Sequence, residues 1–340
     1  MLPWSAELAG RFEQSTLDST LLRDNPLGDP HQRQVLVYLP PGYDESDRRY
    51  PSIYVAIGYT GHVGMWFNRT AFRQPYPEQL DALFAAGDVP PAIVVFFDGW
   101  NRFGGSQYVD SPGTGRYHSH LCEEIVPWVD ATYRTVPERD QRAITGKSSG
   151  GYAAMVTPML RPDLFGALAT HAGDASFELC YRPEFPQRAR ELRDRYAGSF
   201  ENFFAEIAQR PNRITNAELG MLEIYGCSAA YSADPDGTVQ LPFDELGEIR
   251  PEVWQRWLAL DPVVMGAGSH REALGSLRAV WIDAGKQDEY YLDLGATAFE
   301  RVVRAAGVPA VHFELFEGAH GGIEYRYPLA IQWLCEQLSR

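Results

Sequence analysis

The residues best suited to chemistry lie in the segment Gly146-Lys147-Ser148-Ser149-Gly150-Gly151. The short, partly β-branched run 142–145 before it predicts a buried strand, and the small apolar residues from Tyr152 onward predict a helix. A Gly-x-Ser-x-Gly pattern between a strand and a helix is typical of a sharp turn that presents a serine as a nucleophile. The helix N-terminus can then stabilise an oxyanion. The alternative is a glycine-rich turn in which Ser148 or Ser149 caps the helix.

A serine hydroxyl needs a base to take its proton and a carboxylate to orient that base. The chain supplies both in the order Ser, Asp, His, each in a turn after a predicted strand. Asp288 follows the strand 279–283, and His320 lies among glycines after the strand 310–315. We therefore expect Ser148 to act as nucleophile, His320 as base and Asp288 as the orienting acid.

Other residues compete for these roles. For the acid, Asp283 is still within its strand, Glu289 adjoins Asp288, and Asp293 falls at the start of the next helix. For the base, His312 lies inside a strand, which favours a structural role. Asp288 is the best placed because the acid of such a triad is carried by a turn.

Strands and helices alternate over most of the chain, and this alternation can bring the three turns together. The predicted strands are 34–39, 52–57, 92–97, 142–145, 167–170, 279–283 and 310–315, and the predicted helices are 76–86, 121–133, 149–160, 292–306 and 327–338. Such alternation indicates βαβ units and a parallel sheet. We expect an α/β fold with a mostly parallel central sheet flanked by helices, preceded by an extension, 1–30, that holds a strand or a short helix.

The alternation breaks between about Ala175 and Pro262. This segment is helical and rich in aromatic residues, and connections of such length usually carry their own structure and a function. We expect one domain, 1–340, with a helical cap at 175–262 that covers the mouth of the site and sets substrate choice. The alternative is a cap that only covers apolar sheet surface.

Loops at the carboxyl ends of parallel strands build the binding site in such sheets. We expect the backbone N–H groups of Tyr59, in the loop after strand 52–57, and of Ser149 to form an oxyanion hole. The residues expected to bind substrate are Gly58, Trp100, Gln107, Tyr108, Lys147 and His171. Asp174 follows the same strand as His171 and could line the pocket with it. A plain solvated loop is the alternative for the glycine-rich stretch 98–108.

Composition argues against several kinds of partner. The chain has 340 residues and a formal net charge of −15, so we expect neither nucleic acid nor an anionic membrane surface as a partner. Residues 1–7 lack the features of a signal peptide, and no apolar run approaches a membrane span. Cys122, Cys180, Cys227 and Cys335 lack the spacing of a zinc knuckle or a disulfide framework. We expect no metal, no organic cofactor and a reduced, cytoplasmic compartment; a homo-oligomer stays open.

At these motifs the chain resembles the putative-esterase branch of the α/β-hydrolases, which includes S-formylglutathione hydrolases, enterochelin-type and feruloyl esterases, and mycolyltransferases. The shared motifs lie at 39–43, 58–61, 104–108, 146–151, 288 and 318–320. The resemblance covers the chain from about residue 34 to the C-terminus and implies an α/β-hydrolase fold. It implies the roles given above for Ser148, Asp288 and His320, and oxyanion donors at the backbones of Tyr59 and Ser149.

The chain departs from the family pattern in two places. Lys147 precedes the nucleophile where His, Glu or Gln is more usual, and the strand ends in Ile57-Gly58 without the common His-Gly. Neither departure removes a catalytic side chain. The prediction is a serine hydrolase that cleaves small carboxylic esters through an acyl-enzyme. The alternatives are an acyltransferase or thioesterase with the same triad, and a catalytically silent ligand-binding protein on a hydrolase scaffold.

Overall fold

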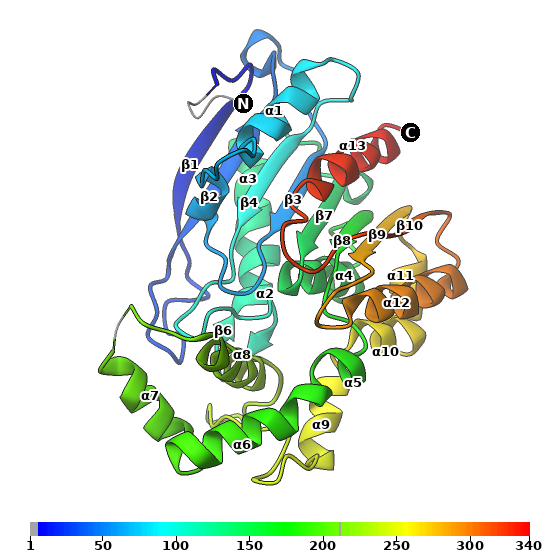
Figure 1. The fold of residues 1–340 in the computed structure, drawn as a ribbon. Coiled ribbons are helices and arrows are strands. Elements are labelled where there is room, and N and C mark those ends of the chain that lie inside the picture. The colour runs from blue at the N-terminus through cyan, green and yellow to red at the C-terminus, as the bar shows by residue number, and fades with distance from the viewer. Residues whose placement is uncertain (1–5, 211) are drawn as a thin grey trace.

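A twisted central sheet runs through the computed structural model, which describes residues 6–210 and 212–340 (Figure 1). Within these residues the sheet has eight strands, in the order β1-β2-β4-β3-β7-β8-β9-β10. The strands are β1 (Arg11–Asp18), β2 (Gln32–Leu39), β3 (Ser52–Ala56), β4 (Ile93–Phe97), β7 (Arg142–Lys147), β8 (Ala167–His171), β9 (Ala279–Gly285) and β10 (Ala310–Phe316). A small separate hairpin joins β5 (Asp110–Ser111) to β6 (Gly115–Arg116).

The prediction of a mostly parallel sheet is confirmed. Strands β4, β3, β7, β8, β9 and β10 run parallel, whereas β2 pairs antiparallel with β4 and β1 antiparallel with β2. Every residue of β3, β4 and β8 is buried, as expected for apolar strands covered on both faces. The strand β1 lies within the expected extension 1–30; residues 1–5, part of the stretch searched for a signal peptide, lie outside the described residues.

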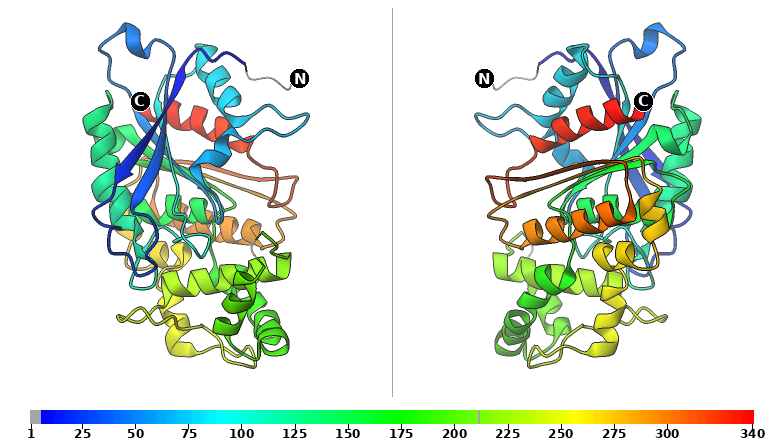
Figure 2. Two further views of the ribbon diagram at one scale, coloured as in Figure 1. Left: turned by 90° about the vertical axis from the view of Figure 1, so that its left-hand side faces the viewer. Right: turned by 90° about the vertical axis from the view of Figure 1, so that its right-hand side faces the viewer.

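Helices cover both faces of the sheet (Figure 2). On one face, α1 (Tyr76–Ala85) and α13 (Arg326–Leu338) pack apolar side chains such as Leu80 and Ile331 against the strands. On the other face, α3 (Val126–Thr132), α4 (Ser149–Leu160) and α12 (Leu292–Ala306) contribute Val129, Met155 and Phe299 to the larger core. The predicted helix 121–133 is α-helical only in α3, because a π-helical turn (His120–Ile125) precedes it.

The segment between β8 and β9 forms a separate helical layer below the carboxyl ends of the strands (Figure 1). Its helices are α5 (Phe177–Cys180), α6 (Phe185–Tyr196), α7 (Phe200–Ala208), α8 (Asn216–Tyr231) and α9 (Pro251–Leu258), and α10 (Pro262–Ala267) and α11 (Arg271–Gly275) lead back to the sheet. Buried aromatic rings give this layer its own core: the ring centroids of Tyr231 and Trp257 are 5.0 Å apart, and those of Phe185 and Trp254 are 5.4 Å apart. In the described part of the chain no helix is both long and apolar enough to cross a membrane.

Candidate active site

The turn between β7 and α4 holds Ser148 in a backbone conformation that few side chains adopt. Its φ is 57° and its ψ is −128°, a combination that costs on the order of 1–3 kcal/mol for a residue other than glycine. The surrounding structure maintains this strain: the N–H of Ser148 donates to the carbonyl oxygens of His171 and Ala172 at 3.0 and 3.1 Å. The glycines of the motif are required by close packing, since a Cβ on Gly146 would lie 2.2 Å from the carbonyl oxygen of Gly150.

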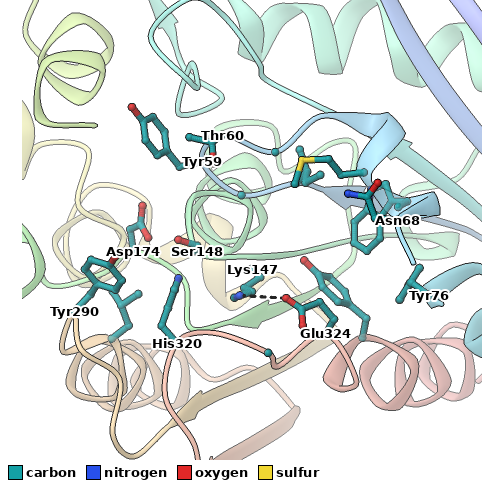
Figure 3. A pocket seen from close by; sticks show the side chains of 18 of the residues that line it. Tyr59, Thr60, Asn68, Tyr76, Lys147, Ser148, Asp174, Tyr290, His320 and Glu324 are labelled. Atoms are coloured by element: carbon teal, nitrogen blue, oxygen red, sulfur yellow. Dashed lines mark hydrogen bonds and ion pairs between the residues drawn. The ribbon is translucent and has the colours of Figure 1, made fainter. Parts of the chain in front are cut away.

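Asp288 and His320 meet because β9 and β10 are neighbouring parallel strands that end together. Oδ2 of Asp288 lies 2.9 Å from Nδ1 of the His320 ring, and the Asp288 side chain is fully buried. The two turns are also tied through their backbones, because the N–H of His320 donates to Glu289 at 3.0 Å. The other ring nitrogen of His320 is therefore free to face the cavity, and Figure 3 shows the ring pointing toward Ser148.

The competing residues are engaged elsewhere. Asp283 is buried behind the site, where its carboxylate accepts hydrogen bonds from Trp281 at 2.7 Å and Arg326 at 3.0 Å. His312 lies in β10 with its ring stacked 3.5 Å from that of Trp281. Glu289 binds the backbone of His320 and not its ring. Asp288 is thus the carboxylate that the structure places on the His320 imidazole.

A cavity of about 860 Å³ opens over Ser148 and His320, and Gly58, Tyr59 and Lys147 also line it (Figure 3). Lys147 reaches across the cavity to Glu324, with 3.5 Å between its Nζ and the carboxylate. A Cβ on Gly58 would lie 3.0 Å from the carbonyl oxygen of Lys147, so this loop passes very close to the serine turn. Gly58 and Lys147 therefore lie where the sequence predicts them, on the cavity wall.

The backbones of Tyr59 and Ser149 flank the serine with unused donors. Neither N–H donates a hydrogen bond to another residue in the described part of the chain. The Tyr59 side chain is held away from the reaction, because its hydroxyl donates to the carbonyl oxygen of Phe103 at 2.7 Å. Ser149 is the first residue of α4, where N–H groups have no partner within the helix. The two N–H groups are thus available to an oxyanion.

Three predicted pocket residues lie outside the cavity wall. Trp100 is 45% exposed on the surface, and Gln107 and Tyr108 are buried beneath the loop that follows β3. The hydroxyl of Tyr108 donates to the carbonyl oxygen of Ile57 at 2.6 Å, and the amide of Gln107 lies 3.3 Å from the sulfur of Cys227. The loop 98–108 therefore supports the cavity wall from behind, because its glycines let it turn inward under Tyr59. None of the three lines the cavity, and Gln107 and Tyr108 are too deeply buried for a plain solvated loop.

His171 is also placed outside the cavity. Its ring is completely buried, with Nδ1 2.7 Å from Asp283, and packs in a T-shaped contact with Tyr327, a residue that does line the cavity. Burial alone would raise the pKa of Asp283, but the charge and hydrogen bond of His171, together with Trp281 and Arg326, hold that pKa below its ordinary value. The carbonyl of His171 supports Ser148, so this residue contributes to the turn and not to the pocket.

Asp174 lines the cavity, as its position after β8 suggests. It is buried and accepts hydrogen bonds from the hydroxyls of Ser149, at 3.1 Å, and Tyr181, at 2.8 Å. Burial raises the pKa of Asp174, and the hydroxyl donors and His320 oppose that shift. Asp174 therefore connects the serine turn to the first residues of the cap.

Sequence reasoning missed several further residues of the cavity wall. From the cap come Glu184 and Glu223, and from the turn after β9 comes Tyr290. Burial, and then the neighbouring Asp174 and Glu184, raise the pKa of Glu223 to about 8. Helical spacing could have grouped Glu223 with Leu219 on one face of α8, but no pattern in the sequence indicates which face meets the site. In the described residues no group of three or more His, Cys, Asp or Glu side chains is arranged to hold a metal.

Comparison with protein families gives a match over most of the chain. The family model described as "Putative esterase" matches residues 30–323. An esterase of Mycobacterium tuberculosis is 31% identical over 144 residues, which are 42% of this chain and 29% of that protein. An endo-1,4-β-xylanase/feruloyl esterase of Xylanibacter ruminicola is 28% identical over 143 residues, 38% of this chain and 18% of that protein. The chain therefore spans less than a third of the length of these relatives.

Solved structures share the fold over nearly the whole length. A ferulic acid esterase superposes with a TM-score of 0.61 at 18% identity, covering 98% of this chain and 100% of the other. An S-formylglutathione hydrolase from Agrobacterium tumefaciens superposes with a TM-score of 0.59 at 16% identity, covering 98% of each chain. With the sheet and its flanking helices, these matches confirm the predicted α/β-hydrolase fold.

Proposed function

This chain belongs to the Putative esterase family, and we propose that it hydrolyses carboxylic esters through an acyl-enzyme formed on Ser148. The observation that carries the proposal is the 2.9 Å contact between Asp288 and His320, with the His320 ring directed at Ser148 in one cavity (Figure 3). A serine becomes nucleophilic when a base of this kind takes its proton.

In the first half of the reaction, Oγ of Ser148 attacks the acyl carbon while His320 accepts the hydroxyl proton. The carbonyl oxygen becomes an oxyanion, which the N–H groups of Tyr59 and Ser149 stabilise. His320 then returns the proton to the leaving alcohol as the C–O bond breaks, and the acyl group remains on Ser148. Asp288 holds the imidazole in the correct tautomer and stabilises its charged form.

In the second half, water replaces the alcohol. His320 takes a proton from the water, the resulting hydroxide forms a bond to the acyl carbon, and the Ser148 ester bond breaks with the proton returned to Oγ. The products are a carboxylic acid and an alcohol. An acyltransferase or a thioesterase would use the same acyl-enzyme with another acceptor or substrate.

The four cysteines are free and buried, which supports a cytoplasmic, reducing compartment.

A fluorophosphonate probe tests the nucleophile. We expect the wild-type protein to acquire the probe on the peptide that contains Ser148, and the Ser148→Ala variant to remain unlabelled. Ser269→Ala is the matched control. Ser269 lies between α10 and α11 and does not line the cavity, so its loss should not affect labelling. A folded wild-type protein that resists the probe would support the silent scaffold instead. Adding an acceptor alcohol to the ester assay then separates hydrolysis from transfer by the product that dominates.

A further inference from the structure

The cavity extends to both sides of Ser148. Figure 3 shows Asp174 and Tyr290 on one side, and Asn68, Tyr76 and Glu324 on the other. The first side, which we call the cap arm, is lined mainly by the cap and the turn after β9. The residues of the cap arm used below are Asp174, Tyr181, Glu184, Glu223, Ile224 and Tyr290. An ester bound at Ser148 must place one of its two parts in this arm.

The cap arm gathers several carboxyl groups with no lysine or arginine on its own wall in the described residues. Asp174, Glu184 and Glu223 bring three carboxyl groups to it. Among the described residues, the lysine and arginine side chains that line the cavity are Lys147 and Arg73. Both belong to the opposite side: Lys147 pairs with Glu324, and Arg73 lies in the segment between Asn68 and Tyr76. The two halves of the cavity therefore differ in charge.

The nearest cation of the cap is already engaged. Arg188 on α6 forms ion pairs of 2.8 Å with both Glu184 and Glu191. It attracts Glu223 only through space, with no hydrogen bond or ion pair between them. Arg188 is therefore held by Glu184 and Glu191 and forms no ion pair with Glu223.

Glu223 is the carboxyl group of the cap arm that has no partner among the described residues, whereas Asp174 and Glu184 have one. It forms no hydrogen bond or ion pair with any other described residue, yet it lines the cavity and lies within electrostatic range of Asp174 and Glu184. Burial and these two carboxyl groups raise its pKa. A carboxylate in such surroundings is stabilised by a positive charge from outside the protein.

Aromatic rings complete the surroundings. Tyr181 and Tyr290 line the cap arm, and Tyr290 lies edge-on to His320 with 5.0 Å between the ring centroids. The face of a tyrosine ring attracts ammonium groups, most strongly where water is displaced. Ile224 adds an apolar contact for the methyl or methylene groups that carry such a charge. Carboxyl groups and tyrosine rings together form a suitable environment for an ammonium group.

We propose that the cap arm binds a positively charged ammonium group of the substrate, and that Glu223 determines this specificity. The inference rests on the proposed function, because it assigns the charge of the ester that Ser148 attacks. The ammonium group takes no part in bond making: ester and water still give acid and alcohol, and the cation leaves with whichever product carries it. Neutral esters of the same shape remain substrates, but poorer ones.

Matched pairs of esters test the proposal on the wild-type protein. One pair carries the charge on the alcohol, butyrylcholine against its uncharged isostere 3,3-dimethylbutyl butyrate. The other carries it on the acyl group, the 4-nitrophenyl esters of 6-(trimethylammonio)hexanoate and of 7,7-dimethyloctanoate. We expect kcat/KM to be on the order of tenfold higher for the cation in at least one pair, a modest value for a charge pair in a partly buried site. Equal values within both pairs would overturn the inference while leaving the esterase intact.

Failure of the proposed function has a different signature. If none of the four esters is cleaved and the fluorophosphonate probe does not react, the esterase proposal fails and this inference fails with it. Binding offers a readout apart from turnover, using the Ser148→Ala protein and calorimetry. We expect choline to bind at least several-fold more tightly than 3,3-dimethylbutanol, and equal affinities would contradict the inference.

The Glu223→Gln variant isolates the charge. It keeps the size and shape of the side chain but removes its charge, so the ratio of kcat/KM between the cationic ester and its neutral isostere should fall several-fold. Glu245→Gln is the matched control, because Glu245 is exposed on the cap and does not line the cavity. If Glu223→Gln keeps the full wild-type preference, Glu223 acts as a neutral hydrogen-bond donor and the inference is wrong. If this variant does not fold, the kcat/KM values of the wild-type protein on the two matched ester pairs still test the inference.

Discussion

The hydroxyl of Tyr108 donates a 2.6 Å hydrogen bond to the carbonyl oxygen of Ile57, the last residue before the Gly58 loop. The Tyr108 ring packs edge-on against Phe97, with 5.6 Å between the centroids, so the donor is held by the sheet itself. The loop that carries the unused N–H group of Tyr59 is therefore held from below. Burial raises the pKa of Tyr108 far above its ordinary value, so the hydroxyl keeps its proton and donates at all physiological pH values.

We expect Tyr108→Phe to lower kcat by about tenfold with little change in KM. The lost hydrogen bond contributes on the order of 1 kcal/mol, and a small displacement of an oxyanion donor costs rate more than binding. Steady-state kinetics on a neutral ester measure the effect. Tyr117→Phe is the control, because its hydroxyl makes only a 3.4 Å bond, to the carbonyl oxygen of Trp100, and does not contact the Gly58 loop. A variant with reduced Tm but unchanged kcat would show that Tyr108 is purely structural.

Asp288 and Asp283 should give opposite phenotypes. Asp288→Asn is expected to lower kcat by about 10³–10⁴ with little loss of stability, because an amide favours the wrong tautomer of His320. Asp283→Asn is expected to lower the free energy of unfolding by about 2 kcal/mol, because the buried donors of His171 and Arg326 lose a charged acceptor. Kinetics and denaturant melts on both variants compare the two. An inactive but stable Asp283→Asn protein would contradict the assignment of the acid.

The preference for cationic esters should depend on pH. The pKa of Glu223 is raised to about 8, so its carboxyl group is neutral in the free enzyme below that pH and ionised above it. A quaternary ammonium keeps its charge throughout, so the ratio of kcat/KM for butyrylcholine to that for its neutral isostere should rise from about pH 6 to about pH 9.

Several groups face Glu223 and set the steepness of this rise. They are Asp174 from the loop after β8, Glu184 before α6, Arg188 on α6, Cys227 on α8, Tyr59 after β3 and Tyr290 after β9. Because burial and the two carboxylates raise the pKa while Arg188 lowers it, an ammonium that binds should lower it further. The ratio should be independent of pH in Glu223→Gln. If the wild-type ratio falls as the pH rises, the cap arm has the opposite charge to the one proposed and the inference is wrong.

The sequence predicted those parts of the site that depend on chain order and local geometry. The Asp288–His320 contact follows from two turns at the ends of neighbouring parallel strands, and the glycines around Ser148 follow from the packing of a sharp turn. The strands of the parallel core were predicted to within about two residues, because their apolar runs and bounding turns are local signals.

The pocket wall could not be predicted in the same way. Gln107 and Tyr108 adopt left-handed backbone conformations, with φ of 53° and 54°, which turn their loop inward and carry both side chains under the site. Glu223 reaches the cavity from a helix 75 residues beyond Ser148, through the tertiary docking of α8. These placements depend on long-range packing, for which a single sequence has no periodic signal.

The cap should divide into residues that bind substrate and residues that hold the cap together. Of four aromatic residues that the sequence makes prominent, Phe177, Tyr181, Tyr231 and Trp257, only Tyr181 lines the cavity. The other three are buried against one another in the aromatic core of the cap. Of these four residues, Tyr181 is therefore the candidate for substrate contact, and the other three are candidates for stabilising the cap.

We expect Tyr181→Phe to change the ratio of kcat/KM between an acetate ester and a bulky aromatic ester by about threefold to tenfold, because specificity reflects differential binding of transition states. The Tyr181 hydroxyl donates a 2.8 Å hydrogen bond to Asp174, so the substitution alters the polarity of the cavity wall while keeping the ring. Phe177→Leu and Trp257→Phe leave space in the cap core and should lower Tm while scaling both esters alike. Kinetics with a melting curve for each variant make the comparison. If activity toward both esters simply follows Tm in Tyr181→Phe as well, the cap supports the fold and does not select the substrate.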